Sequence, residues 1–149
     1  MKNILKKVVV LMLMLAFITP VFSDEDASVT ELKALLKEFE KAVKYEFQDR
    51  GWRGKRNAWI ESVDAADSPQ AFGAVLIQLE TSTTWSSVQA SWRQRRAGWL
   101  EEVRAATTVP QMAGLLFELE KITKWEATYD SWRRNRANWV QRVQALIGS

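Results

Sequence analysis

The sequence contains neither cysteine nor histidine. Without cysteine the chain has no disulfide bond and no thiolate nucleophile, and without histidine it has no imidazole base. The commonest protein ligands of zinc, haem and copper are missing for the same reason. We therefore expect no metal and no cofactor, and the chain must be stabilised by its hydrophobic core.

Glycine and proline are scarce, at six and three residues, and no stretch alternates polar and apolar residues over the length of a strand. The chain also lacks a glycine-rich phosphate loop and a nucleophile elbow. Aspartate and glutamate alone would suffice for a glycan hydrolase with two carboxylates. However, the glutamates recur at equivalent positions, which favours ion pairs, so we predict that the protein is not an enzyme.

Residues 1–23 have the pattern of a signal peptide. Lysines come first, an apolar run follows over residues 8–18, and the small residue Ser23 precedes Asp24. The apolar run is short for a bilayer span. We expect cleavage before Asp24 and export to the periplasm or the extracellular space, with a single uncleaved anchor as the alternative.

Removal of this segment changes the charge of the chain. The whole sequence has 21 basic and 18 acidic residues, and three of the basic ones are Lys2, Lys6 and Lys7. All acidic residues lie at or after Asp24, so the mature chain has 18 of each sign and is formally neutral. Nucleic acid is therefore not an expected partner, since attraction to phosphates needs a net basic surface. Any basic patch must be local.

The chain repeats itself every 40 residues. Three aromatic columns follow this period: Tyr45, Trp85, Trp125; Trp52, Trp92, Trp132; and Trp59, Trp99, Trp139. A glutamate column follows it as well: Glu40, Glu80, Glu120. We interpret residues 24–149 as one domain of three units, at about 28–67, 68–107 and 108–149.

Helical spacing runs through each unit. Apolar residues recur at intervals of three, four and seven, as in Leu32, Leu35, Leu36 and Phe39. Helix starts are indicated at Ser28, at Ser68 before Pro69, and at Thr108. N-cap residues also precede Trp52, Trp92 and Trp132. We predict an all-α fold of three tandem helical repeats, each a helix-turn-helix pair, with a three-helix bundle of long helices as the alternative.

The second half of each unit has the pattern Trp-Arg-x-x-Arg-x-x-Trp. Seven residues of helix turn about 700°, so the two tryptophans fall within roughly 20° of each other. Such a stripe favours packing, and its arginines can pair with the glutamate column or lie over aromatic rings. Arginine interleaved with tryptophan is also typical of anion-binding surfaces. The candidate binding residues are Arg53, Arg56, Arg93, Arg96, Arg133, Arg136, Trp52, Trp92 and Trp132.

One segment has a likeness outside this chain. Residues 99–107 read Trp-Leu-Glu-Glu-Val-Arg-Ala-Ala-Thr, and Leu119-Glu120 and Trp125-Glu126 follow. This segment, about Trp99 to Glu126, resembles a helical segment near the reader domains of eukaryotic chromatin-remodelling subunits. The present chain departs from that family in its predicted signal peptide and in having no zinc-binding or acetyl-lysine-reading neighbour. The resemblance implies a helical unit and no nuclear role.

These features predict an exported, non-enzymatic helical-repeat protein that acts as a protein-protein interaction module. Its expected partner is another extracytoplasmic protein or a second copy of the chain, because a stack of three units without a polar capping unit would leave an apolar end face. The first alternative is a binder of anionic envelope polymer, lipid or glycan through the Trp-Arg segments. The second alternative is a small carboxylate-dependent hydrolase.

Overall fold

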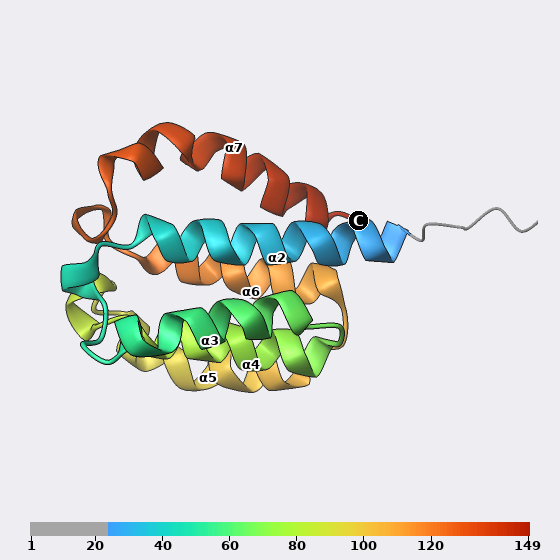
Figure 1. Cartoon of the computed structure of the whole chain (residues 1–149), viewed down its shortest axis with the longest axis horizontal. Helices are drawn as coiled ribbons and strands as arrows, with labels where there is room; N and C mark the ends of the chain where they lie inside the picture. Colours follow the sequence, from blue (N-terminus) through green and yellow to red (C-terminus); the bar gives the residue numbers. More distant parts are fainter. Residues whose placement is uncertain (1–23) are drawn as a thin grey trace, which may run out of the picture.

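The computed structural model describes residues 24–149, and this part of the chain is all-α, as predicted (Figure 1). The predicted signal peptide lies outside the described residues. None of the helices in residues 24–149 combines the length and the hydropathy that a bilayer span requires. The α-helices are α2 (Asp24–Ala42), α3 (Trp52–Ala65), α4 (Pro69–Thr81), α5 (Trp92–Ala105), α6 (Val109–Ile122) and α7 (Asp130–Ile147).

Two helices occupy each 40-residue stretch, and a short 3-10 helix lies between them. These 3-10 helices are η1 (Tyr45–Phe47), η2 (Trp85–Ser87) and η3 (Trp125–Ala127). The residues on both sides of η1, Lys44 and Gln48, have extended backbone, which ends the helical path through the middle of the unit. We call the segments 43–51, 82–91 and 123–129 the first, second and third connectors.

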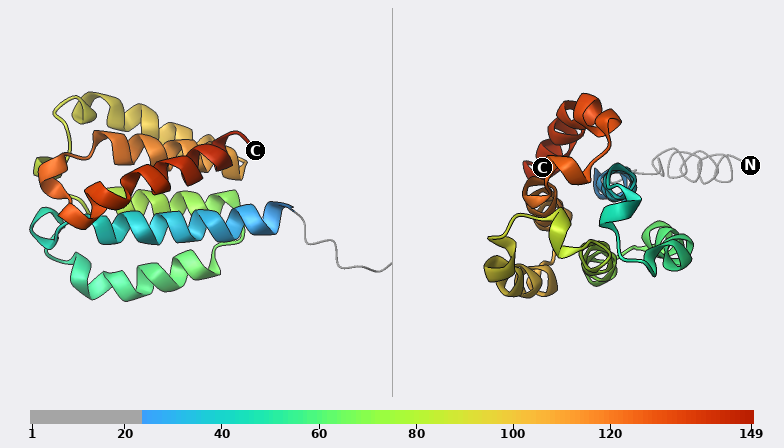
Figure 2. Two further views of the ribbon diagram at one scale, coloured as in Figure 1. Left: turned by 90° about the horizontal axis from the view of Figure 1, so that it is seen from above. Right: turned by 90° about the vertical axis from the view of Figure 1, so that its left-hand side faces the viewer.

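Three inner helices are surrounded by three outer ones. The outer helix α3 packs against α2 and α4, α5 packs against α4 and α6, and α7 packs against α6 and α2. The last outer helix therefore lies against the first inner helix, and the units close into a ring when the molecule is viewed from its end (Figure 2).

From the sequence, we expected self-association because an open stack of units would leave an uncovered end face. That reason is wrong, because contacts between α7 and α2 cover this face; self-association itself stays a prediction.

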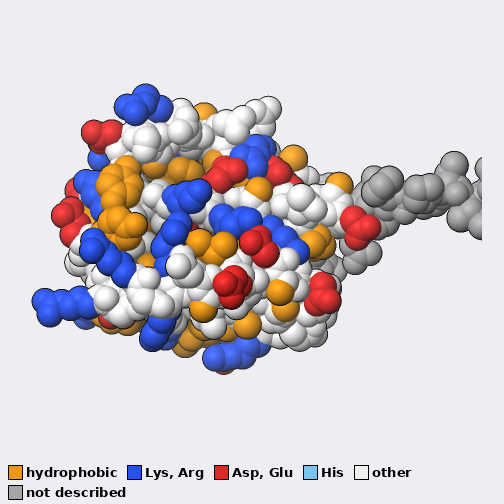
Figure 3. Space-filling view, viewed as in Figure 1, with side chains coloured by type: hydrophobic (Ala, Val, Ile, Leu, Met, Phe, Trp, Pro, Cys, Tyr) orange, Lys and Arg blue, Asp and Glu red, His pale blue; other side chains and the backbone are white. Residues whose placement is uncertain are grey.

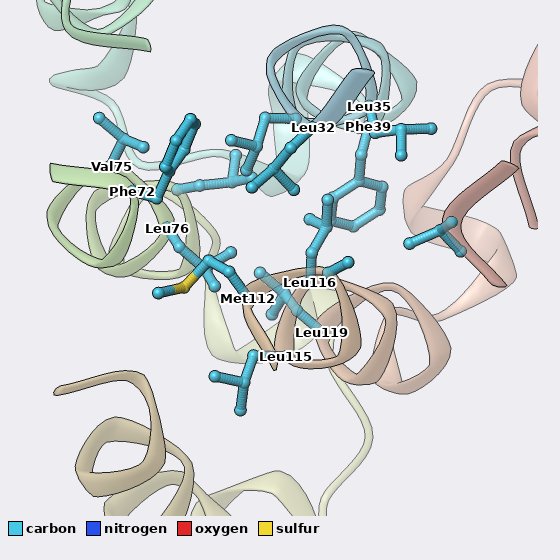
Figure 4. Packing of buried hydrophobic residues seen from close by; sticks show 14 of the residues in the cluster. Leu32, Leu35, Phe39, Phe72, Val75, Leu76, Met112, Leu115, Leu116 and Leu119 are labelled. Carbon is cyan, nitrogen blue, oxygen red and sulfur yellow. The ribbon is translucent and has the colours of Figure 1, made fainter. Parts of the chain in front are cut away.

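The core lies where the inner helices meet. Apolar side chains from α2, α4 and α6 point toward one another in Figure 4, and they include Leu32, Phe72, Leu76, Met112 and Leu116. Each of these five side chains is at most 2% exposed. The apolar columns read from the sequence are thus the facing sides of the inner helices, and their burial is the main stabilising contribution.

One tryptophan on each outer helix binds the inner helix of the following unit. The indole N–H of Trp59 donates to the carbonyl oxygen of Val75 at 2.9 Å, and that of Trp99 donates to Leu115 at 3.1 Å. Trp139 donates to the carbonyl oxygen of Leu35 at 3.1 Å, across 104 residues of sequence. The same bond therefore joins each pair of neighbouring units, including the third and the first.

The inner helices α4 and α6 begin at the predicted caps. The Ser68 hydroxyl accepts from the backbone of Ala71, and Thr108 forms a reciprocal capping box with Gln111. The predicted start at Ser28 is wrong, since α2 already begins at Asp24.

We expect Thr108→Ala to lower the free energy of unfolding by about 1 kcal/mol, because it removes the side chain that accepts from the Gln111 backbone. Thr81→Ala is the matched control, since Thr81 is also an exposed threonine but is the last residue of α4, at the C-terminal end of its helix. Urea denaturation of both variants measures the difference. Equal midpoints for Thr108→Ala and the unaltered protein would show that the cap contributes nothing.

Candidate functional site

Buried glutamates are held by arginine and tryptophan side chains beside the connectors. Glu40 is 2% exposed, and its carboxylate accepts from Arg56 Nε at 2.8 and 3.0 Å. The indole N–H of Trp52 donates to the same carboxylate at 3.0 Å. The buried charge therefore has both an ionic partner and a neutral donor, as a buried carboxylate requires.

The second unit repeats both contacts, and the third unit repeats the arginine-glutamate pair. Arg96 donates to Glu80 at 2.7 and 2.9 Å, and Trp92 donates to Glu80 at 3.1 Å. Arg136 donates to both carboxylate oxygens of Glu120, at 2.5 and 2.8 Å. Hydrogen bonding to these glutamates raises the pKa of the three arginines Arg56, Arg96 and Arg136, so all three stay charged. These pairs join the two helices of one unit, as the sequence allowed.

Three of the predicted binding arginines are thus engaged inside the protein. All three tryptophans predicted to bind a partner are buried too: Trp52, Trp92 and Trp132 are 5%, 1% and 6% exposed. Each of them meets the following tryptophan of its helix edge to face, with ring centroids 5.4 to 5.6 Å apart. These six residues hold the helices together, and one of them also reaches an exposed ring: the Arg136 side chain is 30% exposed, and its guanidinium carbon lies 5.6 Å from the ring centroid of Trp125.

The three most exposed aromatic residues form the one aromatic column from which no candidate binding residue was taken. Tyr45, Trp85 and Trp125 are each about half exposed, at 51%, 50% and 49%. They continue the spacing of seven into the buried tryptophans, and periodicity alone therefore placed them on the same packing stripe. The helix break in each unit removes them from that stripe. The N-cap residues before Trp52, Trp92 and Trp132 were a sequence signal for this difference, although α3, α5 and α7 begin without a side-chain cap bond.

The remaining predicted arginines lie over these exposed rings. The guanidinium carbon of Arg53 is 4.4 Å from the ring centroid of Tyr45, and that of Arg93 is 5.2 Å from Trp85. Arg133 lies 5.6 Å from the ring centroid of Trp125. A guanidinium over an aromatic face at this distance is held in place while its N–H groups remain available to an acidic partner.

All three aromatic-arginine pairs lie at one end of the molecule, because the connectors bond to one another. Lys44 N donates to Ala127 O at 2.8 Å, and Thr84 N donates to Phe47 O at 3.0 Å. Lys124 N donates to Ser87 O at 2.8 Å, which completes a closed ring of backbone hydrogen bonds. The connectors gather at the left-hand end in Figure 1 and face the viewer in the right panel of Figure 2.

We call the surface formed by residues 41–54, 81–94 and 121–134 the connector end. It carries nine lysine and arginine residues against four acidic ones, a net charge of +5, while residues 24–149 as a whole are neutral. The rest of the domain therefore carries −5. In the space-filling view, basic and hydrophobic side chains lie beside each other at this end (Figure 3). A basic patch on a formally neutral chain must be local, and the charge of the connector end is such a local excess.

Hollows accompany the exposed rings. One of about 430 Å³ is lined by Trp125, Lys121, Lys124 and Gln89, and it joins the second and third connectors. Another of about 540 Å³ is lined by Tyr45, Gln48, Arg50 and Arg53. Both are open and have polar side chains beside an aromatic ring, which suits the side chains of a partner better than an enclosed small molecule.

Carboxylates do not gather into a metal site in the described residues. Residues 24–149 contain no group of three or more aspartate or glutamate side chains placed to hold a metal ion. The buried glutamates lie one to a unit, and each is held by its own arginine.

Comparison with known proteins adds one finding. A family model described as "Domain of unknown function (DUF8799)" matches residues 26–83, which is less than half of the chain. No curated protein and no solved structure matches the chain. The likeness of Trp99 to Glu126 to chromatin-remodelling subunits stays a prediction.

Proposed function

We propose that the protein is a non-enzymatic interaction module that binds a partner protein through its connector end. The observation that carries this proposal is the set of three half-exposed aromatic rings, each covered by an arginine, on one end of a closed helical ring. Tyrosine, tryptophan and arginine are the residues that dominate binding energy at protein interfaces. The buried Glu-Arg pairs below this surface fix the helices that present it.

A rigid presentation favours this use of the surface. The aromatic rings lie on 3-10 helices whose flanking residues are hydrogen-bonded to the neighbouring connectors. A guanidinium and a ring that are already stacked lose little conformational freedom when a partner binds. The surface is therefore prepared for binding before the partner arrives.

A second candidate function is supported by the charge of +5 at the connector end. A surface of that charge also attracts an anionic envelope polymer, lipid or glycan. Four carboxylates lie among the cations of this end: Glu46, Asp49, Glu126 and Asp130. They would repel a uniform polyanion, whereas a protein surface can offer charges of both signs, so we place the protein partner first.

We also propose that binding takes place outside the cytoplasm, in the periplasm or beyond it. The pattern of residues 1–23 supports this location. Fractionation of host cells, with mass spectrometry of the N-terminus, tests it. A cytoplasmic chain that still begins at Met1 would refute export.

Capture from host envelope extract tests the proposed function. We expect Trp85→Ala combined with Trp125→Ala to weaken retention of the partner protein about tenfold or more, because interface tryptophans are frequent hot spots. Ile147→Ala is the control, since Ile147 is a 39% exposed hydrophobic residue at the opposite end. Quantitative mass spectrometry of retained proteins gives the ratio.

Three outcomes decide this test. Loss of a protein partner in the double variant but not in the control supports the interaction module. Equal retention by all three proteins contradicts the assignment of the surface. Retention of only lipid, glycan or nucleic acid, released at high salt, favours the second candidate.

A further inference from the structure

The cations of the connector end are unevenly distributed among the three stretches that form it, 41–54, 81–94 and 121–134. Eight of the nine lie in 41–54 and 121–134, and 81–94 has only Arg93. The two charged stretches have matching lysines: Lys41 and Lys121, and Lys44 and Lys124. At the corresponding positions the second unit has Thr81 and Thr84. The four acidic residues of the connector end also lie in the two lysine-bearing stretches, so each of these has a net charge of +2, against +1 for 81–94.

The two charged connectors are neighbours, although their sequences are about 80 residues apart. Lys44 N donates to Ala127 O at 2.8 Å, and Tyr129 N donates to Ala42 O at 3.0 Å. An isolated bridge pairs Val43 with Thr128. Closure of the ring therefore brings Lys44 beside the third connector, the connector that Lys121 and Lys124 precede. We call this contact of the first and third connectors the junction, and Tyr45 and Trp125 are the exposed rings of its two connectors.

The cations at this junction have no acidic partner inside the domain. Within residues 24–149, the ion pairs engage Lys37, Arg56, Arg95, Arg96, Arg136 and Arg142, and none of these lies at the junction. Lys41, Lys121 and Lys124 are exposed, as are Arg53 and Arg133. Exposed, unneutralised cations beside half-exposed rings are complementary to carboxylates carried on a chain with apolar groups.

We propose that the partner presents an acidic segment of polypeptide that lies across the junction of the third and first connectors. Its aspartate or glutamate side chains pair with the junction lysines, and its apolar side chains contact Tyr45 and Trp125. This inference rests on the proposed function, because it specifies the chemistry of the same surface. It also assigns unequal roles to the three units, with the second unit contributing contact area and little charge.

Selection from a random peptide library displayed on phage tests this inference with the purified protein. We expect enriched peptides to be rich in aspartate and glutamate. We further expect Lys41→Gln combined with Lys121→Gln to weaken a synthetic copy of the best peptide about tenfold, because each exposed ion pair contributes up to about 1 kcal/mol. Lys55→Gln combined with Arg104→Gln is the matched control, since it removes the same charge at two other exposed positions.

The outcomes separate this inference from the proposed function. Acidic peptides that are weakened by the junction variant and not by the control support both. Enriched peptides without acidic residues that still lose affinity in the Trp85→Ala, Trp125→Ala protein would overturn the acidic segment and keep the surface. Peptides insensitive to every connector variant would overturn both proposals, and equal weakening by junction variant and control would reduce the effect to net charge.

Discussion

Trp139→Ala is expected to destabilise the domain by about 3 to 5 kcal/mol, which is the usual cost of removing a fully buried tryptophan. Trp139 is 1% exposed, its ring contacts Trp132 and Phe39, and its N–H bonds to Leu35 O of the first inner helix. Loss of this contact opens the ring at the junction of the third and first units. Such domains are stable by only about 5 to 15 kcal/mol, so the variant should be almost completely unfolded at the denaturant concentration where half of the unaltered protein is unfolded.

Two matched substitutions separate the components of this effect. Trp139→Phe keeps most of the apolar area and loses the N–H donor, so it should cost about 1 to 2 kcal/mol. Trp125→Ala removes the same side chain from a position that is 49% exposed and should cost less than Trp139→Ala. Guanidinium denaturation measures all three. Similar losses for Trp125→Ala and Trp139→Ala would contradict the division into exposed and buried columns.

Arg96→Ala is expected to cost about 3 kcal/mol or more, because it leaves the buried carboxylate of Glu80 without its ionic partner. The Glu80 side chain is only 6% exposed, and Trp92 then supplies its one remaining side-chain donor in the described structure. Removal of one member of a buried pair costs more than the pair contributes, since the remaining charge cannot regain its water.

Arg93→Ala is the natural control, since Arg93 lies on the same helix α5 and was part of the same predicted site. It is exposed and lies over Trp85, so its removal should cost at most about 1 kcal/mol. Thermal unfolding of both variants is the measurement. If Arg93→Ala is as damaging as Arg96→Ala, the division of the six predicted arginines into core and surface groups is wrong.

The sequence was sufficient to predict the inner helices, and it allowed the Glu-Arg pairs as one of several uses of the arginines. Both features depend on residues that lie within one unit. Leu32, Leu35, Leu36 and Phe39 show helical spacing directly, and the caps at Ser68 and Thr108 are local signals. Tyr45 could not be separated from Trp52 and Trp59, since all three share one spacing of seven. Only the extended backbone of the connector turns Tyr45 outward.

Ring closure could not be predicted from the sequence, for another reason. A repeat of 40 residues is compatible with an open stack and with a ring, and the choice depends on how each outer helix is angled over the next inner helix. The bond from Trp139 to Leu35 O decides it here. Arg142 strengthens this closure through ion pairs with Glu31 and Glu38, which have no full counterpart in the other units. The junction of Lys44 and Lys124 follows from closure, so it was hidden as well.

Site-specific photo-cross-linking in host envelope tests the central claim most directly. A photoreactive residue replaces Ser86 at the connector end in one protein and Asp67 at the opposite end in another; both positions are exposed. Our account predicts a discrete cross-linked protein from position 86, absent from position 67. A partner joined only from position 67 would contradict the account.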